Sequence, residues 1–298
     1  MVPDQVSFFL VGAMKAGTSS VNAYLAQHPG IFMCPIKDGR FFFFEGDAAQ
    51  EYHDPFAKEF RDGSILGWNR YSELLSGAER SQVVGESTAL YLYSDYACHR
   101  IKKYYPDAKI IIFLREPASR TYSHYHQAVK NGMEKLNFAE ALEAEDWRIE
   151  HGWGPTYHYK RRSVYVPQLT NYLENFPPDN LRIYLQEDLR AAPKETMSDI
   201  FDFLGVDRNF EIDFQKRHNI GLTPRHPWLY HHIYRPDSIL RAAIPLPVRK
   251  YISGVYRALL MSSPPPIDAV VRNSLTDYFT PDILSLQSMI GRDLSHWM

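Results

Sequence analysis

The stretch FFLVGAMKAGTSSVNAYLAQHP, residues 8–29, decides the expected fold. It overlaps the apolar run VSFFLVG (residues 6–12), which ends in glycine as a central parallel strand does. The apolar residues at positions 21, 24 and 25 then follow helical spacing. The turn between these two segments carries Lys15 and three hydroxyl groups, at positions 18–20. A strand, a glycine turn and a helix N-terminus in this order are typical of a phosphate-binding loop.

The lysine of this loop is not where an ATPase needs it. A Walker loop has lysine directly after its second glycine, whereas Lys15 precedes Gly17 here. The backbone N–H groups and the helix N-terminus still supply partial positive charge. We therefore expect a phosphate cradle with Lys15 at its edge, facing the group beyond the bound phosphate.

Strand and helix patterns alternate along the chain up to about residue 206. Further strand candidates are QVVGES (82–87), AKIIIFLREP (108–117) and LRIYLQ (181–186), and the helix candidates are residues 117–130, 137–145, 163–177 and 193–206. This alternation predicts a parallel sheet with helices on both faces. We expect an α/β, P-loop-like three-layer fold in a single domain, 1–298, with a looser helical portion from about residue 228 and a final helix pair between about residues 267 and 294.

Composition excludes several classes of protein. The chain has 298 residues, 45% of them hydrophobic, and a net charge of −2, which gives no bulk basic field for nucleic acid. Two cysteines cannot form a disulfide framework. The sequence shows neither a basic leader before the first strand nor an apolar run of about 20 residues. We expect a soluble, cytoplasmic protein without membrane partners.

The strongest strand candidate, KIIIFLREP, ends in Arg115. A kinase or NTPase needs a carboxylate for Mg²⁺, usually at the end of a neighbouring strand. An arginine in that place binds an anion instead, so we expect no metal site. Metal independence would separate the protein from an atypical nucleotide kinase.

Taken together, these motifs resemble those of the sulfotransferases that use PAPS, 3′-phosphoadenosine 5′-phosphosulfate. KAGTSS resembles the 5′-phosphosulfate loop of that family, and FLREPASRTYSHYHQ resembles its 3′-phosphate motif. The resemblance covers most of the chain and is closest to the branch that includes heparan sulfate sulfotransferases and their bacterial relatives. It implies cofactor contacts from Lys15, Ala16, Gly17, Thr18, Ser19 and Ser20, and a 3′-phosphate clasp formed by Arg115 and Ser123.

The resemblance also implies in-line transfer of a sulfuryl group to a hydroxyl or amine, leaving adenosine 3′,5′-bisphosphate. Lys15 would stabilise the charge that develops on the leaving oxygen. Asp38 stands where the branch often has a glutamate base, in CPIKDGRFFFF. This is a departure, because aspartate is shorter and Arg40 could pair with it and lower its basicity. A structural Asp-Gly turn is the alternative for Asp38, and Glu86 is the second candidate base, with loop anchoring as its own alternative.

The remaining contacts rest on weaker signals. The resemblance puts a nucleotide-facing tyrosine near Tyr165 and a late loop with Arg217 and Arg225 over the nucleotide. The KRRSVY run (160–165) could equally be a solvated face. The FFFF run (41–44) and the aromatic residues Trp68, Tyr71, Tyr91, Tyr93 and Tyr96 could line an acceptor cleft or belong to the core. The acceptor is expected to be a small or carrier-bound hydroxylated metabolite, and a scaffold that has lost its base is the non-catalytic alternative.

Overall fold

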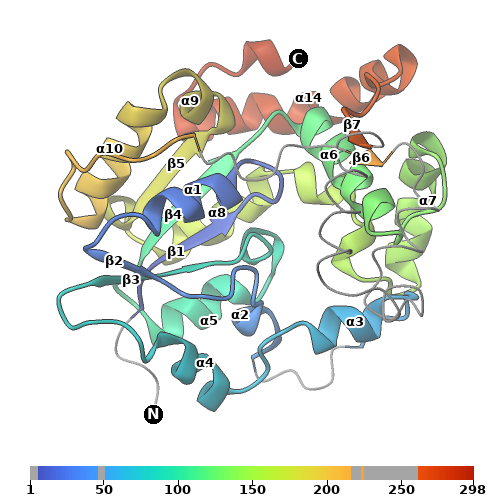
Figure 1. The fold of residues 1–298 in the computed structure, drawn as a ribbon. Helices are drawn as coiled ribbons and strands as arrows, with labels where there is room; N and C mark the ends of the chain where they lie inside the picture. Colours follow the sequence, from blue (N-terminus) through green and yellow to red (C-terminus); the bar gives the residue numbers. More distant parts are fainter. Residues whose placement is uncertain (1–5, 46–50, 216–222, 225–260) are drawn as a thin grey trace.

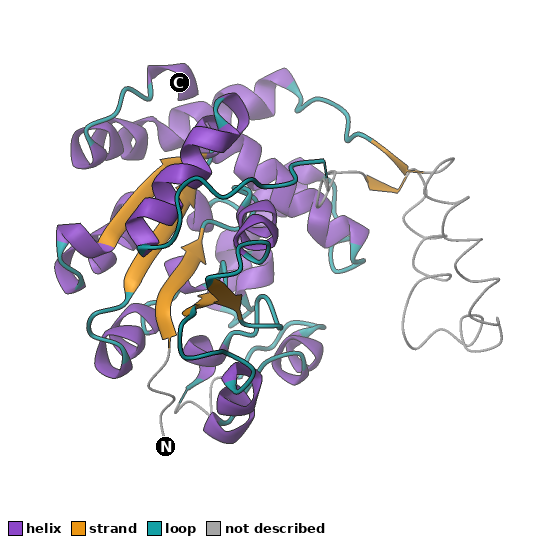
Figure 2. Ribbon diagram, turned by 60° about the vertical axis from the view of Figure 1, so that its left-hand side comes forward, coloured by secondary structure: helices purple, strands orange, loops and turns teal. Residues whose placement is uncertain are grey.

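The computed structural model describes residues 6–45, 51–215, 223–224 and 261–298. Its centre is a parallel five-stranded sheet with the strand order β2-β3-β1-β4-β5, seen in Figure 1. The strands are β1 (Val6–Gly12), β2 (Ile31–Met33), β3 (Val83–Ser87), β4 (Lys109–Leu114) and β5 (Leu181–Leu185). A short antiparallel pair, β6 (Thr223–Pro224) and β7 (Met261–Ser262), lies apart from the sheet (Figure 2). The expected P-loop-like α/β fold is confirmed.

Helices cover both faces of the sheet. The α-helices are α1 (Thr18–Leu25), α2 (Phe41–Phe44), α3 (Ala57–Asp62), α4 (Trp68–Leu75), α5 (Ala97–Tyr104), α6 (Pro117–Lys130), α7 (Phe138–Glu150), α8 (Val166–Asn175), α9 (Gln186–Ala191), α10 (Pro193–Leu204) and α14 (Ala269–Ile290). Single 3₁₀ turns are η1 (Tyr91–Tyr93), η2 (Pro155–Tyr157), η3 (Arg161–Ser163), η4 (Pro178–Asn180) and η5 (Ser295–Trp297). α1 and α10 share one face, where the rings of His28 and Phe201 lie 4.7 Å apart. α5 and α8 cover the other face, where the Tyr172 hydroxyl donates to the Tyr91 carbonyl at 3.0 Å.

Two expected features of the secondary structure are wrong. The expected C-terminal helix pair is one helix, α14, which continues through Pro281. Leu275, Phe279, Ile283 and Leu286 form one buried stripe on both sides of that proline, so packing outweighs the lost backbone hydrogen bond. The short helix expected to end near residue 145 continues to Glu150, and a capping box of Asn137 and Glu140 fixes its start.

The core is built around β1 and β4. Phe8, Phe9 and Leu10 are fully buried, as are all residues of β4 except Lys109. Gly85 lets β3 pass beside β1, since a Cβ there would lie 2.1 Å from the Phe8 ring. The four phenylalanines of α2, together with Tyr71 and Tyr91, are also buried, so these rings belong to the core and not to an acceptor cleft.

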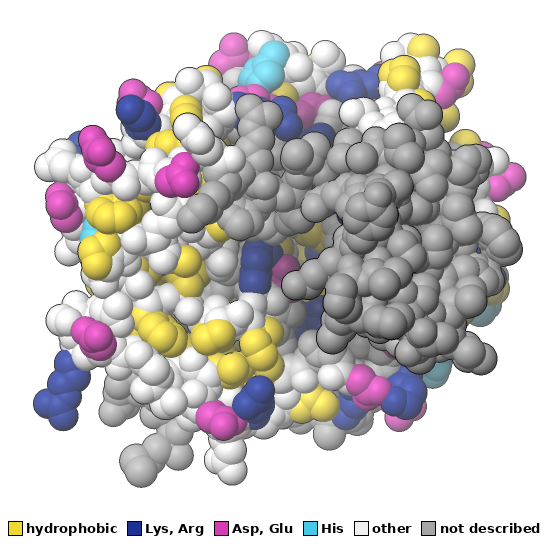
Figure 3. Space-filling view, viewed as in Figure 1, with side chains coloured by type: hydrophobic (Ala, Val, Ile, Leu, Met, Phe, Trp, Pro, Cys, Tyr) yellow, Lys and Arg dark blue, Asp and Glu magenta, His cyan; other side chains and the backbone are white. Residues whose placement is uncertain are grey.

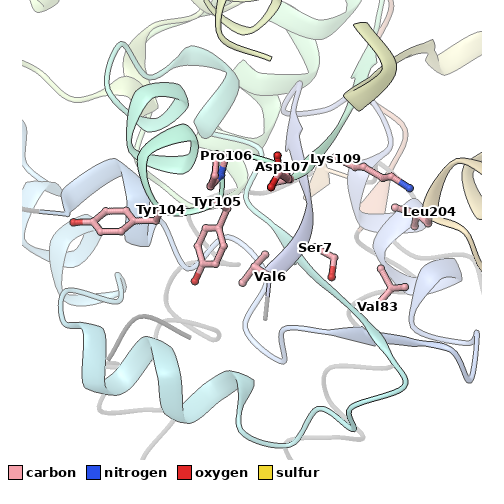
Figure 4. Close-up of a pocket in the computed structure, with 10 residues that line it drawn as sticks. Val6, Ser7, Val83, Tyr104, Tyr105, Pro106, Asp107, Lys109 and Leu204 are labelled. Atoms are coloured by element: carbon pink, nitrogen blue, oxygen red, sulfur yellow. The ribbon is translucent and has the colours of Figure 1, made fainter. Parts of the chain in front are cut away.

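A hollow of ≈ 520 Å³ opens at the amino ends of the strands (Figure 4). It is lined by the first residues of β1, β3 and β4, including Val6, Val83 and Lys109. In parallel α/β sheets, ligands bind at the opposite, carboxyl edge, and the cationic residues described below lie at that edge.

No helix in the described ranges is both long enough and apolar enough to cross a bilayer.

Candidate active site

The loop between β1 and α1 ends at Gly17, whose backbone lies in the left-handed region. Gly17 has φ 103° and is the N-cap of α1, a conformation that residues with a Cβ adopt only with strain. Its carbonyl accepts hydrogen bonds from the N–H groups of Ser20 (2.9 Å) and Val21 (3.2 Å). The N–H groups of the first turn of α1 therefore lie at the carboxyl edge of the sheet, as an anion cradle requires.

Lys15 is mostly buried within this loop. Its Nζ donates to Oε1 of Gln127, on α6, at 2.8 Å. Its backbone carbonyl accepts from Arg115 Nη1 at 3.1 Å and from Gln186 Nε2 at 3.3 Å. Burial, followed by the nearby charges of Arg115 and other cations, lowers the pKa of Lys15 to about 8. The Arg115 side chain, which follows β4, is thus hydrogen-bonded to the backbone of the loop after β1.

Arg115 follows directly after β4, and its surroundings are fixed by Tyr165. The Tyr165 hydroxyl donates to the Arg115 carbonyl at 2.7 Å. Burial, and then the charge of Arg190, lowers the pKa of Arg115. Ser123 lies on α6 one turn before Gln127, so both side chains share a helix face. Within the described part of the chain, no carboxylate forms an ion pair with Lys15 or Arg115.

Asp38 stands at the carboxyl edge, between β2 and α2. Its backbone N–H donates to the Ser87 carbonyl at 2.8 Å, and its Oδ1 accepts from the Ala89 N–H at 2.9 Å. Its Oδ2 accepts from Lys37 Nζ at 2.6 Å, and 45% of its side chain is exposed. The expected partner, Arg40, instead donates to Ser64 Oγ and to the Phe60 carbonyl. Lys37 is therefore the hydrogen-bonded cation beside this carboxylate.

Glu86 lies at the end of β3 but is only 2% exposed. Its carboxylate accepts hydrogen bonds from the hydroxyl groups of Tyr91 (2.6 Å), Tyr71 (2.7 Å) and Thr88 (2.9 Å). Burial raises the pKa of Glu86. The geometry favours the anchoring alternative, because the two tyrosines tie α4 and η1 to β3.

Two buried arginines near this edge were not predicted. Arg120, on α6, is 0% exposed and donates through Nη2 to the Tyr159 carbonyl at 2.6 Å. Arg162 is 6% exposed, so this part of the KRRSVY run does not form the solvated face that was one of its two interpretations. No motif in the sequence distinguishes Arg120 from other helix residues, and nothing in a run of three basic residues marks which of them turns inward.

The space-filling view shows charged side chains on one face of the molecule. In Figure 3, Lys or Arg side chains and an Asp or Glu side chain are visible in a hollow near the middle of the face. Figure 1 shows α6 and α7 beyond the carboxyl ends of the strands. Among the described residues, no group of three or more His, Cys, Asp or Glu side chains is arranged to hold a metal ion. Arg217 and Arg225 lie outside the described residues.

This donor set fits a polyanionic nucleotide. A helix N-terminus, a mostly buried lysine and an arginine converge at one edge of a P-loop-like sheet, and no carboxylate of the described residues pairs with either cation. Such a fold and site define a class of α/β proteins that bind a nucleotide through its phosphate groups.

Comparison with known proteins identifies the family. The model described as "Sulfotransferase family" matches residues 7–210, more than half of the chain. The crystal structure of a sulfotransferase from Alicyclobacillus acidocaldarius superimposes with a TM-score of 0.76 at 29% identity, covering 98% of each chain. The chain therefore belongs to the sulfotransferase family, the enzymes that take a sulfuryl group from PAPS.

Curated relatives are more distant and longer. The membrane-associated sulfotransferase kil1 of Dictyostelium discoideum is 21% identical, covering 73% of this chain and 60% of the relative. The heparan sulfate glucosamine 3-O-sulfotransferase 6 of Mus musculus is 27% identical, covering 67% and 52%. The bifunctional heparan sulfate N-deacetylase/N-sulfotransferase 3 of Mus musculus is 25% identical, covering 68% and 22%. The matched part thus spans less than two thirds of each of these relatives.

Proposed function

We propose that this protein transfers the sulfuryl group of PAPS to a hydroxyl or amine of a small or carrier-bound acceptor, without a metal ion and in the cytoplasm, as a single domain over residues 1–298. One observation carries the proposal: the Lys15 carbonyl joins the phosphate loop to Arg115 at 3.1 Å. The loop and the end of β4 then form one anion site, which suits a nucleotide with phosphate groups at both ends of its ribose.

The proposed cofactor contacts are those that the sequence motifs imply. The backbone of Ala16 and Gly17 and the first-turn hydroxyls of Thr18, Ser19 and Ser20 hold the 5′-phosphosulfate. Arg115 and Ser123 hold the 3′-phosphate by charge-assisted hydrogen bonds. The proposed contacts that complete the cofactor site are those of Tyr165, Arg217 and Arg225.

Lys15 and Asp38 carry the chemistry in this proposal. PAPS, when bound, supplies an activated sulfuryl group whose departure leaves negative charge on the oxygen between phosphorus and sulfur. The Lys15 ammonium, held by Gln127, donates a hydrogen bond to developing charge at that end of the loop. Asp38 takes the proton of the acceptor, since its carboxylate is exposed and its position is fixed by Ala89. Glu86, the second candidate base, is already occupied by three hydroxyl groups, which supports an anchoring role.

Calorimetric titration tests the cofactor assignment. The protein is titrated with adenosine 3′,5′-bisphosphate, AMP and ATP in the presence of EDTA. We expect tight binding of the bisphosphate and weak binding of the other two. ATP binding that appears only with Mg²⁺ would contradict the proposal and favour a nucleotide kinase.

Arg115→Ala locates the 3′-phosphate. We expect it to weaken bisphosphate binding roughly 100-fold, as loss of a charge-assisted pair does, and to leave AMP binding nearly unchanged. Equal losses for the two ligands would remove Arg115 from the 3′-phosphate site.

A further inference from the structure

Arg162 is a buried cation with few partners. It lies on η3, is 6% exposed, and donates one hydrogen bond within the described residues, from Nη1 to the Pro155 carbonyl at 3.2 Å. A guanidinium carries five N–H donors, so four are left without a protein acceptor there. Burial, and then the nearby charge of Arg120, lowers the pKa of Arg162 to about 9. Buried charges are normally paired, which makes this an unusual place for an arginine.

Arg120 lies behind Arg162 and intensifies the positive field. Its Nε donates at 2.5 Å to the Oγ of Ser163, the residue that follows Arg162 in the chain. Its Nη1 has no hydrogen-bond partner in the described part of the protein. Burial lowers the pKa of Arg120 to about 10. Arg120 is 0% exposed and Arg162 is 6% exposed, so Arg162 is the more accessible of the two. Arg120 fixes η3 through Ser163 and leaves Arg162 as the outward member of the pair.

Arg162 packs against Tyr93, and the charge of Asp38 acts on it. Its Cζ is 5.6 Å from the centre of the Tyr93 ring. The Tyr93 hydroxyl donates to His158 Nδ1 at 2.7 Å, since His158 Nε2 donates to the Trp153 carbonyl at 2.9 Å and only Nδ1 is left to accept. Burial lowers the pKa of His158 to about 4, so His158 adds no charge. Asp38, the proposed base, is the carboxylate among the described groups that acts on Arg162.

We propose that Arg162 binds an oxyanion of the acceptor, a carboxylate or a phosphate, close to the hydroxyl or amine that Asp38 deprotonates. This inference rests on the proposed function and deepens it by naming the acceptor class. The four unused donors form a planar fork that matches an oxyanion. The overall charge of −2 does not argue against it, because four cations gather at this edge and none has a hydrogen-bonded carboxylate among the described residues: Lys15, Arg115, Arg120 and Arg162.

In the test, the cofactor site is first saturated, and binding of a second anion is then measured. Protein saturated with adenosine 3′,5′-bisphosphate is titrated with two matched pairs of phenols while its Tm is followed. One pair is 4-hydroxyphenylacetate and 4-hydroxyphenylacetamide, and the other is 4-hydroxyphenyl phosphate and 4-methoxyphenol. We expect the charged member of at least one pair to bind roughly 10- to 100-fold tighter than its neutral partner, as expected for hydrogen bonds to a charged group. The better pair distinguishes carboxylate from phosphate.

Arg162→Gln should remove that preference, while Arg161→Gln, the exposed neighbour on the same turn, should keep it. If the unaltered protein binds the charged and neutral probes equally well, the inference is overturned, and no variant is needed to show it. A preference that survives Arg162→Gln in folded protein also overturns it. Absence of bisphosphate binding in the first step refutes the proposed function instead, so the two failures are distinguishable.

Discussion

At the scale of single residues, Asp38 and Glu86 show how surroundings separate two carboxylates at one edge of a sheet. Asp38 is nearly half exposed and touches one backbone N–H and one lysine. Glu86 is buried and fully engaged with hydroxyl groups. A proton acceptor must reach the substrate, whereas a buried, saturated carboxylate holds segments together.

We expect Asp38→Asn to lower turnover about 10²- to 10⁴-fold, the usual contribution of a general base, and to leave bisphosphate affinity unchanged. The hydrogen bond from Ala89 can be kept by the amide oxygen, so the fold should be preserved. The measurement is the rate of bisphosphate release from PAPS with a given acceptor.

Glu86→Gln is the matched control for that experiment. Its amide leaves one tyrosine hydroxyl without a charged acceptor, which should lower the free energy of unfolding by about 1–3 kcal/mol, with turnover of the folded protein retained. Near-normal turnover of Asp38→Asn, combined with loss of turnover in Glu86→Gln, would move the base to Glu86.

The lowered pKa of Lys15 predicts a pH dependence of cofactor binding. In the free protein the amine titrates at about pH 8, and a bound polyanion favours its charged form, so binding raises that pKa. Above about pH 8 the complex must therefore take up a proton, and affinity falls as the pH rises. Titration of adenosine 3′,5′-bisphosphate at about pH 8.5, in two buffers of different ionisation enthalpy, measures this uptake. Lys15→Gln should abolish it, and zero uptake by the unaltered protein would contradict the assignment.

At the scale of elements, the turn before α1 depends on one backbone conformation. Gly17 has φ 103°, and a Cβ there would lie 3.5 Å from Leu189, so the cost of a side chain is mainly backbone strain, about 1–2 kcal/mol. We expect Gly17→Ala to lower both the free energy of unfolding and the affinity for the bisphosphate. Gly205→Ala is the matched control, because Gly205 has φ 78° at the end of α10 and open space around it. It should lower stability alone. An equal effect of both variants on affinity would mean that strain in the loop is not transmitted to the ligand.

Local signals explain which elements could be predicted from the sequence. β1 with α1, and β4 with α6, each combine an apolar run, a turn and a helix start within about 20 residues, and both were predicted. β2 was not predicted, because its three residues, Ile31–Met33, are too few to show a period. The helix pair expected between about residues 267 and 294 was wrong, because the buried stripe of α14 is a tertiary contact that no local window contains.

The residues of the candidate site also divide into those that a local motif predicts and those that depend on tertiary contacts. Lys15 and Arg115 belong to contiguous motifs, and their connection through the Lys15 carbonyl follows from adjacent parallel strands. The partners of Glu86 come from α4 and η1, and the burial of Arg162 comes from its position against Tyr93. These are tertiary contacts between segments far apart in the sequence, and neither residue spacing nor composition specifies them. The roles of Ser123 and Tyr165 remain predictions.

At the scale of the whole molecule, the C-terminal segment contacts α8 and α9, next to the phosphate loop, and we expect it to brace that loop. The family match ends at residue 210, but Asp282, on α14, accepts from the N–H groups of Tyr165 (2.7 Å) and Val166 (3.0 Å). Arg292 forms an ion pair with Asp188, on α9. Helix α9 also carries Gln186, which reaches the Lys15 carbonyl. The chain end is thus linked to the proposed site through two separate routes.

Trp297 provides the sharpest test of this brace. It is 1% exposed, and its Nε1 donates to Glu187 Oε1, on α9, at 3.0 Å. Trp297→Ala should lower the free energy of unfolding by about 3–5 kcal/mol, as large-to-small changes in a core do. If the brace positions α9, it should also weaken bisphosphate binding about fivefold or more under conditions where the protein is folded. Met298→Ala, at an exposed neighbour, should change neither quantity. A loss of stability with unchanged bisphosphate affinity would show that the segment only completes the hydrophobic core. If the segment braces the loop, removing its contacts must change the affinity of the loop for the bisphosphate.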